Sequence, residues 1–338
     1  RDVVVGKQER RLREGGPTIA DWIGRFRPDR INVIPLFEDM ARMLDAHNVV
    51  RRYLQDKDIA DQRVFLARSD PAMNYGLISA VLLNKIALQN LQGVSEEAGA
   101  GIHPIIGVGS APFRGGLTPL TVDRVAAEYP SVRTFTVQSA FKYDYQLEDV
   151  QNAIRVLEER QPAKPTKIEE DAALDIIWRY TRAYERWLGP FAPLINRVAR
   201  YVPERRKRKL HIGLFGYARN TGGITLPRAI KFTAAFYSIG LPPEILGLNV
   251  LDDADIEFIR KVYVNFDEDL RAACRFLNTE TGFVPPDLAA RVTDLVDVVQ
   301  DEEHARLTTA ISRALRENET GGLTPLILEA ANRRRFLG

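Results

Sequence analysis

The chain is predicted to fold as an α/β protein, specifically a TIM-type (β/α) barrel with many additional helices. Short apolar runs alternate with amphipathic stretches over residues 31–245, which is typical of parallel strands joined by helical crossovers. The apolar runs are nearly continuous, as expected for a sheet covered on both faces. Residues 246–338 show helical patterns throughout. A doubly wound open sheet is the alternative, although no GxGxxG pattern follows a strand.

Five strand–helix units are expected between residues 31 and 245. Their strands are predicted at 31–37, 63–67, 102–108, 132–137 and 210–214. Their helices are predicted at 38–55, from 77 to a stop at Gly93, and at 122–128, 147–159 and 227–239. A barrel needs eight such units, so the barrel is expected to be incomplete at its N-terminus.

The whole chain, 1–338, is predicted to form a single catalytic domain. Residues 1–30 form a basic initial segment, and 168–201 form a helical insertion whose helix covers 168–188. Further helices are predicted at 253–277, 286–299, 302–316 and 323–335. The chain starts at Arg1 rather than at a methionine, and we expect an N-terminal segment to be missing.

Composition indicates a cytoplasmic protein without a nucleic-acid or membrane partner. The net charge is only +2, and neither a signal peptide nor an apolar run of membrane-spanning length is present. The basic run at 204–209 is interpreted as a solvated loop. Cys274 is the single cysteine, which fits a reducing compartment. No HxxxH or CxxC spacing occurs, so zinc is not expected, and His304 is predicted to be exposed on a helix.

Carboxylates follow the first two predicted strands. Glu38 comes directly after the first strand, and Asp70 follows the second. Taken singly, each residue has an ordinary structural role, as a first-turn acid or an N-cap of the next helix. Parallel strands end at one edge, however, so the two carboxylates are expected to converge there. Two carboxylates suit a hard cation, Mg²⁺ or Mn²⁺, which leaves room for substrate oxygens.

Basic and amide side chains follow the other predicted strands. The third strand leads into a glycine-rich loop at 107–119, where Gly115 and Gly116 follow Arg114. The remaining groups at these strand ends are Gln138, Lys142, Arg219 and Arg228. Glycines let backbone N–H groups approach an anion, and arginine grips phosphate or carboxylate with a planar fork of donors. The edge therefore suits metal-assisted chemistry on a phosphorylated acid.

Five blocks of this sequence resemble the archaeal-type phosphoenolpyruvate carboxylase family. They are VIPLFED (33–39), SDPAMNYG (69–76), GVGSAPFRGGLTP (107–119), TVQSAFKYDY (136–145) and LPRAIKFTAAFYSIGLPPE (226–244). The resemblance runs to the terminal RRFLG and covers nearly the whole chain.

The resemblance implies a role for each matching residue. Glu38 and Asp70 match metal ligands, and three arginines match catalytic residues that stabilise the transferred phosphate: Arg114, Arg219 and Arg228. Four further residues are expected to bind substrate, namely Gly115, Gly116, Gln138 and Arg10, with Arg11 as the alternative to Arg10. Lys142 is added to them for its place after the fourth strand, not for a match to the family. The sequence departs from the bacterial pattern at Met73 and Val108, where lysine and arginine are usual. The family's essential upstream histidine has no counterpart here.

The resemblance also implies the reaction. Phosphoenolpyruvate and bicarbonate would give oxaloacetate and phosphate, through carboxyphosphate and a metal-bound enolate, with Mg²⁺ or Mn²⁺ as cofactor and a homotetramer as the assembly. Two alternatives stay open. One is another metal-dependent barrel lyase or aldolase acting on pyruvate or its enol. The other is an inactive truncated fragment with a structural role.

Overall fold

A computed structural model of the chain describes residues 6–25, 33–55, 57, 59–204, 219–221 and 224–338. The chain forms two compact units, Arg1–Pro35 and Leu36–Gly338. The first unit contains the helix α2 (Ile19–Ile23), which begins with a reciprocal capping box between Thr18 and Asp21. The single catalytic domain over 1–338 stays a prediction.

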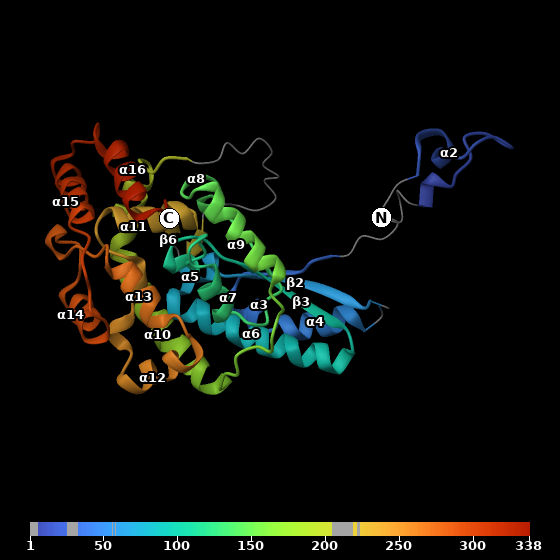
Figure 1. The fold of residues 1–338 in the computed structure, drawn as a ribbon, viewed down its shortest axis with the longest axis horizontal. Helices are drawn as coiled ribbons and strands as arrows, with labels where there is room; N and C mark the ends of the chain where they lie inside the picture. The colour runs from blue at the N-terminus through green and yellow to red at the C-terminus, as the bar shows by residue number, and fades with distance from the viewer. Residues whose placement is uncertain (1–5, 26–32, 56, 58, 205–218, 222–223) are drawn as a thin grey trace. The chain divides into compact units, whose positions relative to one another are not determined.

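A four-stranded parallel sheet organises the second unit (Figure 1). Its strands follow the chain order: β1 (Leu36–Phe37), β2 (Asp61–Ala67), β3 (Gly101–Gly107) and β4 (Thr134–Phe135). One row across the sheet joins Phe37 to Leu66, Leu66 to Ile106, and Ile106 to Phe135. Because all four strands run the same way, their C-terminal ends share one edge. The predicted α/β class with a parallel sheet is confirmed.

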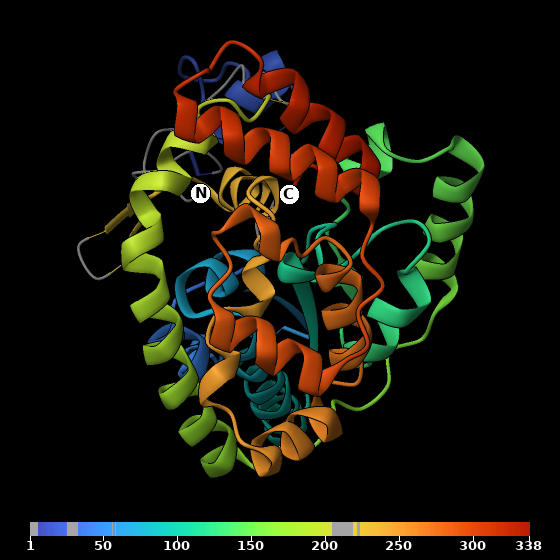
Figure 2. The same cartoon turned by 90° about the vertical axis from the view of Figure 1, so that its left-hand side faces the viewer.

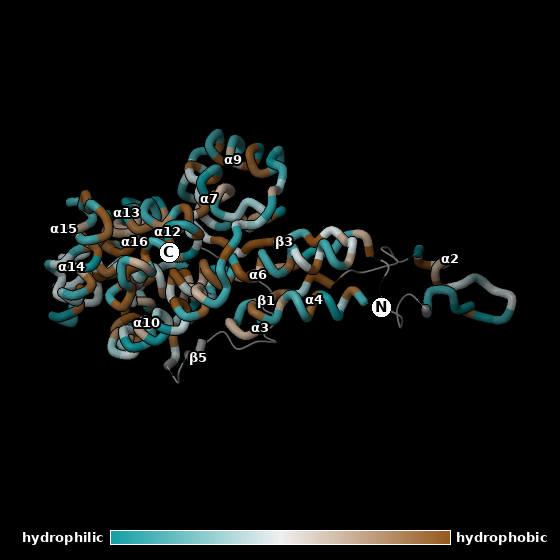
Figure 3. The backbone as a smooth tube through the Cα atoms, turned by 90° about the horizontal axis from the view of Figure 1, so that it is seen from below, coloured by the Kyte–Doolittle hydropathy of each residue, from teal (hydrophilic) through white to brown (hydrophobic). Residues whose placement is uncertain are grey.

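The connections between and after these strands are helical. They are α3 (Met40–Leu44), α4 (Ala46–Leu54), α5 (Ser69–Tyr75), α6 (Leu77–Ala98), η1 (Pro112–Arg114), α7 (Val122–Glu128), α8 (Ala140–Tyr143) and α9 (Leu147–Glu159). The helix α6 is the core of the unit, because it packs against β3, α3, α4, α5 and α10. Its residues 77–88 are all buried, and most of them are apolar, as expected for a helix that the core encloses on every side. Figure 3 shows the apolar colour of β3 beside it.

Helices fill the remainder of the second unit. They are α10 (Glu170–Ala199), α11 (Ala229–Ser238), η2 (Pro243–Ile245), η3 (Leu248–Val250), α12 (Asp253–Val262), α13 (Phe266–Cys274), η4 (Thr279–Thr281), α14 (Pro286–Leu295), α15 (Glu302–Glu317) and α16 (Leu323–Arg334). The helices after α10 gather on one side of the unit, coloured gold to red in Figures 1 and 2. None of the described helices combines the length and apolar content that crossing a membrane requires.

Two predicted helix boundaries are wrong. Gly93 does not stop a helix: α6 continues to Gly99, which takes the left-handed conformation with φ of 62°. An interior glycine costs about 1 kcal/mol, and the buried neighbours Leu91 and Val94 keep the helix in the core. The helix predicted at 168–188 extends to Ala199 through two prolines, because its apolar face continues over Ile195 and Val198.

Two helices predicted as continuous are each split. Residues 38–55 divide at Asp45, which accepts a hydrogen bond from Asn48 at 3.0 Å. Residues 253–277 divide before Asn265, whose main-chain N–H donates to Glu128 at 2.8 Å. At Asn265 the main-chain N–H takes a tertiary partner in place of a helical hydrogen bond, whereas at Asp45 the main chain keeps its helical hydrogen bonds to Ala41 and Val49.

The fifth predicted strand–helix unit differs from the prediction in the residues that the structure describes. The strand predicted at 210–214 lies outside the described residues. Between it and the predicted helix at 227–239, where no strand is predicted, lie two antiparallel strands, β5 (Arg219–Thr221) and β6 (Ile224–Leu226). The predicted helix at 227–239 follows as α11.

Candidate active site

The C-terminal edge of the parallel sheet collects four of the predicted site segments. Glu38 directly follows β1, and Asp70 lies in the first turn of α5 after β2. The glycine-rich loop follows β3, and Gln138 lies three residues beyond β4. The register of the sheet brings the C-terminal ends of all four strands to one level. The four segments therefore lie side by side along this edge, in the same order as in the chain.

The two candidate metal ligands follow adjacent strands, Glu38 after β1 and Asp70 after β2. Both Glu38 and Asp70 are partly exposed. The main-chain N–H of Met40 donates to the Tyr75 hydroxyl at 3.2 Å, which joins the start of α3 to the end of α5. The carboxylate of Asp39 caps α3 by accepting from the Arg42 N–H at 3.0 Å. Of the two carboxylates after β1, the cap therefore uses Asp39, and Glu38 is the candidate ligand.

The donor set fits the expected cation. Carboxylate oxygens are hard ligands, and Mg²⁺ usually takes one or two of them while keeping water or substrate oxygens. Among the described residues, no group of three or more His, Cys, Asp or Glu side chains is placed to hold an ion. Glu38 and Asp70 would supply the protein ligands for Mg²⁺ or Mn²⁺ at this edge.

The glycine-rich loop forms a tight turn around Arg114. The Gly109 N–H donates to the Arg114 carbonyl at 2.7 Å, and the Leu117 N–H donates to the Gly109 carbonyl at 2.8 Å. Gly115 has a φ of 111° and Gly116 a φ of 68°, values that favour glycine. A Cβ at Gly109 would lie 2.6 Å from Cζ of Arg114, so the guanidinium lies directly on this glycine.

Arg114 and Gln138 are in direct contact. Nη2 of Arg114 donates to Oε1 of Gln138 at 2.6 Å, which leaves the Gln138 amide nitrogen as the donor. Nη1 of Arg114 donates to the carbonyl oxygen of Gly338, and Gly338 packs against Ile230 in the first turn of α11. The Arg114 side chain is thus fixed on both arms, and the residue is only 4% exposed. The structure brings these two predicted site residues together.

Two buried charged residues flank the same turn and were not singled out from the sequence. Arg68, at the end of β2, donates to the Phe113 carbonyl at 3.0 Å and to the Tyr129 hydroxyl at 3.2 Å. Glu244, in η2, accepts from the Phe113 N–H at 2.7 Å and from the Tyr237 hydroxyl at 2.6 Å. Arg68 directly follows the predicted strand 63–67, which is the signal that marked the other site residues, whereas Glu244 is marked only as a charged residue inside an apolar block.

The surroundings of Glu244 and Arg68 raise the pKa of both side chains. Burial raises the pKa of Glu244 to about 7, although hydrogen bonds from Tyr237 and Phe113 act in the opposite direction. Burial alone would lower the pKa of Arg68, but the neighbouring Tyr129 and Tyr263 raise it overall, so Arg68 stays charged.

Four predicted site residues lie elsewhere or cannot be placed against this edge. Lys142 is exposed in α8, with its Nζ 5.1 Å from the centre of the Tyr143 ring. Arg228 is exposed at the N-cap of α11, two residues before Ile230. Arg219 lies in β5, and its side chain falls outside the described part. Arg10 is exposed and belongs to the first unit.

The prediction for His304 is wrong. The residue is fully buried in α15, its Nε2 lies 2.8 Å from Nη1 of Arg334, and its ring lies 4.8 Å from that of Phe276. Burial, with the adjacent Arg334 charge, lowers the pKa of His304 to about 2. The ring is therefore a neutral part of the core.

Comparison with known proteins identifies the family. The sequence model for phosphoenolpyruvate carboxylase matches residues 1–338. The chain is 53% identical to the phosphoenolpyruvate carboxylase of Methanothermobacter thermautotrophicus, over 100% of this chain and 70% of that protein. It is 52% identical to that of Methanospirillum hungatei over the same shares, and 44% identical to that of Halobacterium salinarum over 99% and 69%. The chain belongs to the phosphoenolpyruvate carboxylase family.

Proposed function

We propose that this chain carboxylates phosphoenolpyruvate with bicarbonate, giving oxaloacetate and phosphate, at the C-terminal edge of the parallel sheet. The observation that carries the proposal is the contact between Arg114 and Gln138 at 2.6 Å, on the same edge as the two carboxylates. This edge combines the fixed guanidinium of Arg114 with the carboxylate oxygens of Glu38 and Asp70. Binding a phosphorylated carboxylic acid together with a metal ion needs both kinds of group.

The chain's own residues are assigned to the phosphate end of the substrate. The Arg114 guanidinium stabilises the charge of the phosphoryl group as it passes to bicarbonate, forming carboxyphosphate and the enolate of pyruvate. The donor nitrogen of Gln138 orients an anionic oxygen beside it. Gly115 and Gly116 let the main chain approach closely. Arg219 and Arg228 add positive charge, and Lys142 and Arg10 are proposed as further substrate contacts. Carboxyphosphate then releases CO₂ and phosphate, and the enolate carbon bonds to CO₂.

Glu38 and Asp70 are proposed to hold Mg²⁺ or Mn²⁺. Such a cation, when bound, neutralises the negative charge of the phosphate and of the developing enolate oxygen. The carboxylates themselves fix its position between the ends of β1 and β2.

The wider assembly is part of the same proposal. The four parallel strands form part of a TIM-type barrel, whose active sites lie at the C-terminal face. The helices after α11 would supply contacts for a homotetramer. The buried, free Cys274 is compatible with a cytoplasmic protein.

Oxaloacetate formation tests the function directly. The 338-residue chain and an N-terminally extended version would be assayed with phosphoenolpyruvate and Mg²⁺, coupled to malate dehydrogenase, with bicarbonate present or omitted. We expect turnover that requires bicarbonate and releases one phosphate per oxaloacetate. Product formation without phosphate release would indicate the lyase or aldolase alternative. No turnover in either folded version would refute the proposal.

A substitution at Glu38 tests the metal site. Glu38→Gln keeps the size of the side chain but removes its charge, so we expect weaker Mg²⁺ activation and lower turnover. Asp39→Asn is the matched control, because asparagine caps a helix as well as aspartate does. Unchanged turnover of Glu38→Gln at saturating metal would contradict the assignment.

A further inference from the structure

The peptide groups on both sides of Phe113 are held by buried charged side chains from distant parts of the chain. Glu244 accepts from the Phe113 N–H, 131 positions away in the sequence. Arg68 donates to the Phe113 carbonyl, 45 positions away. Glu244 is 0% exposed and Arg68 is 1% exposed. The residue that follows Phe113 is Arg114.

Burying the Glu244 carboxylate has a cost in folding free energy, whereas the surroundings of Arg68 favour its charged form. Taking a carboxylate or guanidinium out of water is unfavourable unless the group is well paired. Here the hydrogen bonds of Arg68 go to neutral oxygens, and those of Glu244 come from a peptide N–H and a phenol. Oε2 of Glu244 is buried with no hydrogen-bond partner among the described residues. The two side chains share one effect, which is to fix the main chain next to Arg114.

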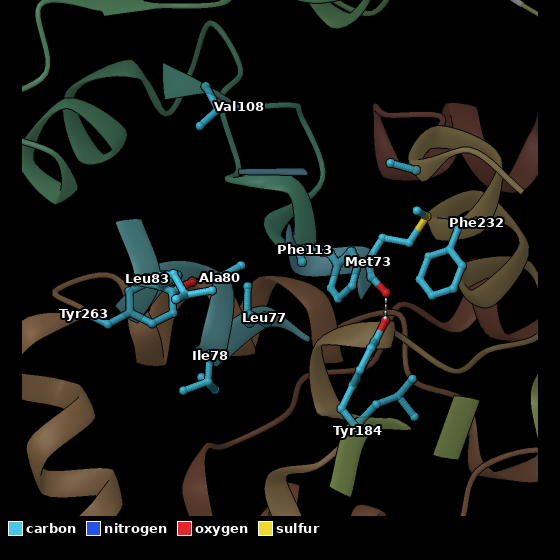
Figure 4. Packing of buried hydrophobic residues seen from close by; sticks show 14 of the residues in the cluster. Met73, Leu77, Ile78, Ala80, Leu83, Val108, Phe113, Tyr184, Phe232 and Tyr263 are labelled. Carbon is cyan, nitrogen blue, oxygen red and sulfur yellow. Dashed lines mark hydrogen bonds between the residues drawn. The ribbon is translucent and has the colours of Figure 1, made fainter. Parts of the chain in front are cut away.

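The Phe113 side chain gives the turn a third anchor. Its ring stacks on Phe232 of α11 with centroids 5.8 Å apart, and Figure 4 shows it among the core residues near Met73. With side chain, N–H and carbonyl all held, the turn η1 has little freedom to rotate. The Arg114 guanidinium is then kept between Gly109 and Gln138.

We propose that Glu244 and Arg68 are positioning residues for Arg114, acting through the two hydrogen bonds to the main chain of Phe113. The role in catalysis rests on the proposed carboxylase function. The positioning itself does not, because it concerns the geometry of the turn. Neither residue is proposed to touch the substrate.

Hydrogen exchange tests the positioning without any activity. In Glu244→Ala, the acceptor of the Phe113 N–H is lost, so exchange in the peptide 107–119 is expected to rise. In Glu244→Gln, the amide Oε1 accepts the same two hydrogen bonds, and exchange is expected to stay close to that of the unmodified chain. Asp255→Asn is the control, because Asp255 is also buried and pairs with Arg179 on α10, away from the turn. Equal protection of 107–119 in all variants would overturn the proposal.

Kinetics then tests whether the positioning acts through Arg114. Displacing a catalytic group by a fraction of an ångström lowers turnover more than binding, so Glu244→Ala is expected to lower kcat by about 10- to 100-fold with a smaller change in KM. Glu244→Gln should recover most of this loss. If Glu244 works through Arg114, adding Glu244→Ala to Arg114→Ala should cost less than about twofold more.

The outcomes separate the two proposals. A full additional loss in the double variant, or equal losses in the alanine and glutamine variants, would show that Glu244 does not act through Arg114. If Glu244→Ala does not fold, Glu244→Gln and Arg68→Met replace it. Arg68→Met removes a hydrogen bond to Phe113 and is expected to lower kcat and the protection of 107–119, whereas Glu244→Gln is expected to keep both. If the unmodified protein forms no oxaloacetate, the proposed function fails, and the exchange experiment alone decides on the positioning.

Discussion

Gly109 offers the sharpest test of where the Arg114 guanidinium must lie. A Cβ at this position would lie 2.6 Å from Cζ of Arg114 and 2.8 Å from both of its terminal nitrogens. Non-bonded carbon atoms prefer separations of about 3.5–4.0 Å, so Gly109→Ala requires a shift of about 1 Å. Only the end of a flexible side chain needs to move, so the loop itself can stay in place.

The shift is expected to lower both stability and activity. Nη2 of Arg114 would move away from Gln138, from 2.6 Å to beyond hydrogen-bond distance. A hydrogen bond from a charged donor contributes about 1.5–3 kcal/mol to stability, and the bond from Nη1 to the Gly338 carbonyl would be disturbed as well. A misplacement of this size at a catalytic group lowers turnover by about 100-fold. We therefore expect Gly109→Ala to fold, to lose about 1.5–3 kcal/mol of stability, and to have a kcat for oxaloacetate formation about two orders of magnitude lower.

Gly93→Ala is the matched control for this substitution. Gly93 lies inside α6, and a Cβ there would meet nothing within 4 Å. Alanine is the better helix former, so this variant should gain about 0.5–1 kcal/mol and keep its turnover. The assays are the coupled oxaloacetate assay and unfolding in urea. If folded Gly109→Ala keeps its kcat within about twofold, the position of the Arg114 guanidinium does not matter and the reasoning fails.

Three further predictions concern buried titratable groups. Burial raises the pKa of Glu244 to about 7, so the unmodified protein loses stability as the pH rises from about 4.5 to 7. Glutamine does not titrate, so between pH 5 and pH 8 the Glu244→Gln variant should gain up to about 3 kcal/mol of stability relative to the unmodified protein, as measured by urea unfolding. Lys85 and Glu128 form a buried pair at 2.6 Å, so Lys85→Met should cost about 3–5 kcal/mol, and adding Glu128→Gln should recover part of it in thermal unfolding. Burial also raises the pKa of Cys274, so iodoacetamide should label this thiol only after unfolding, as measured by mass spectrometry.

The meeting of Arg114 and Gln138 could be predicted from the sequence. These residues are 24 positions apart, but each follows a short apolar run. Parallel strands place their C-terminal ends at one edge, so the alternation of strands and helices is enough to bring the two together. The same reasoning predicts Glu38 and Asp70 at the ends of adjacent strands, and β1 and β2 are indeed paired. The short lengths of β1 and β4 could not be predicted, because the apolar runs continue beyond the paired residues.

Helix boundaries were harder to predict because tertiary packing overrides local preference. Glycine usually ends a helix, yet Gly93 sits between residues that the core holds in place. In the sequence, His304 is a polar residue of an amphipathic helix, which predicts that it is exposed. Its full burial is explained by its contact with Arg334 on α16. In both cases the deciding contact involves a residue or a surface that is remote in sequence.

Glu244 and Arg68 could not have been assigned to the site for a different reason. Residues that contact a phosphorylated substrate are charged or polar themselves, so they stand out where a strand ends. Arg68 also stands out in this way, but that signal does not tell which group it contacts. The partner of Glu244 and Arg68 is the main chain of Phe113, and every residue except proline carries the same N–H and carbonyl groups. No sequence pattern distinguishes one peptide group from another. A sequence therefore reveals the residues that bind a substrate more readily than those that hold them in position, and the latter have to be found from the contacts of the folded chain.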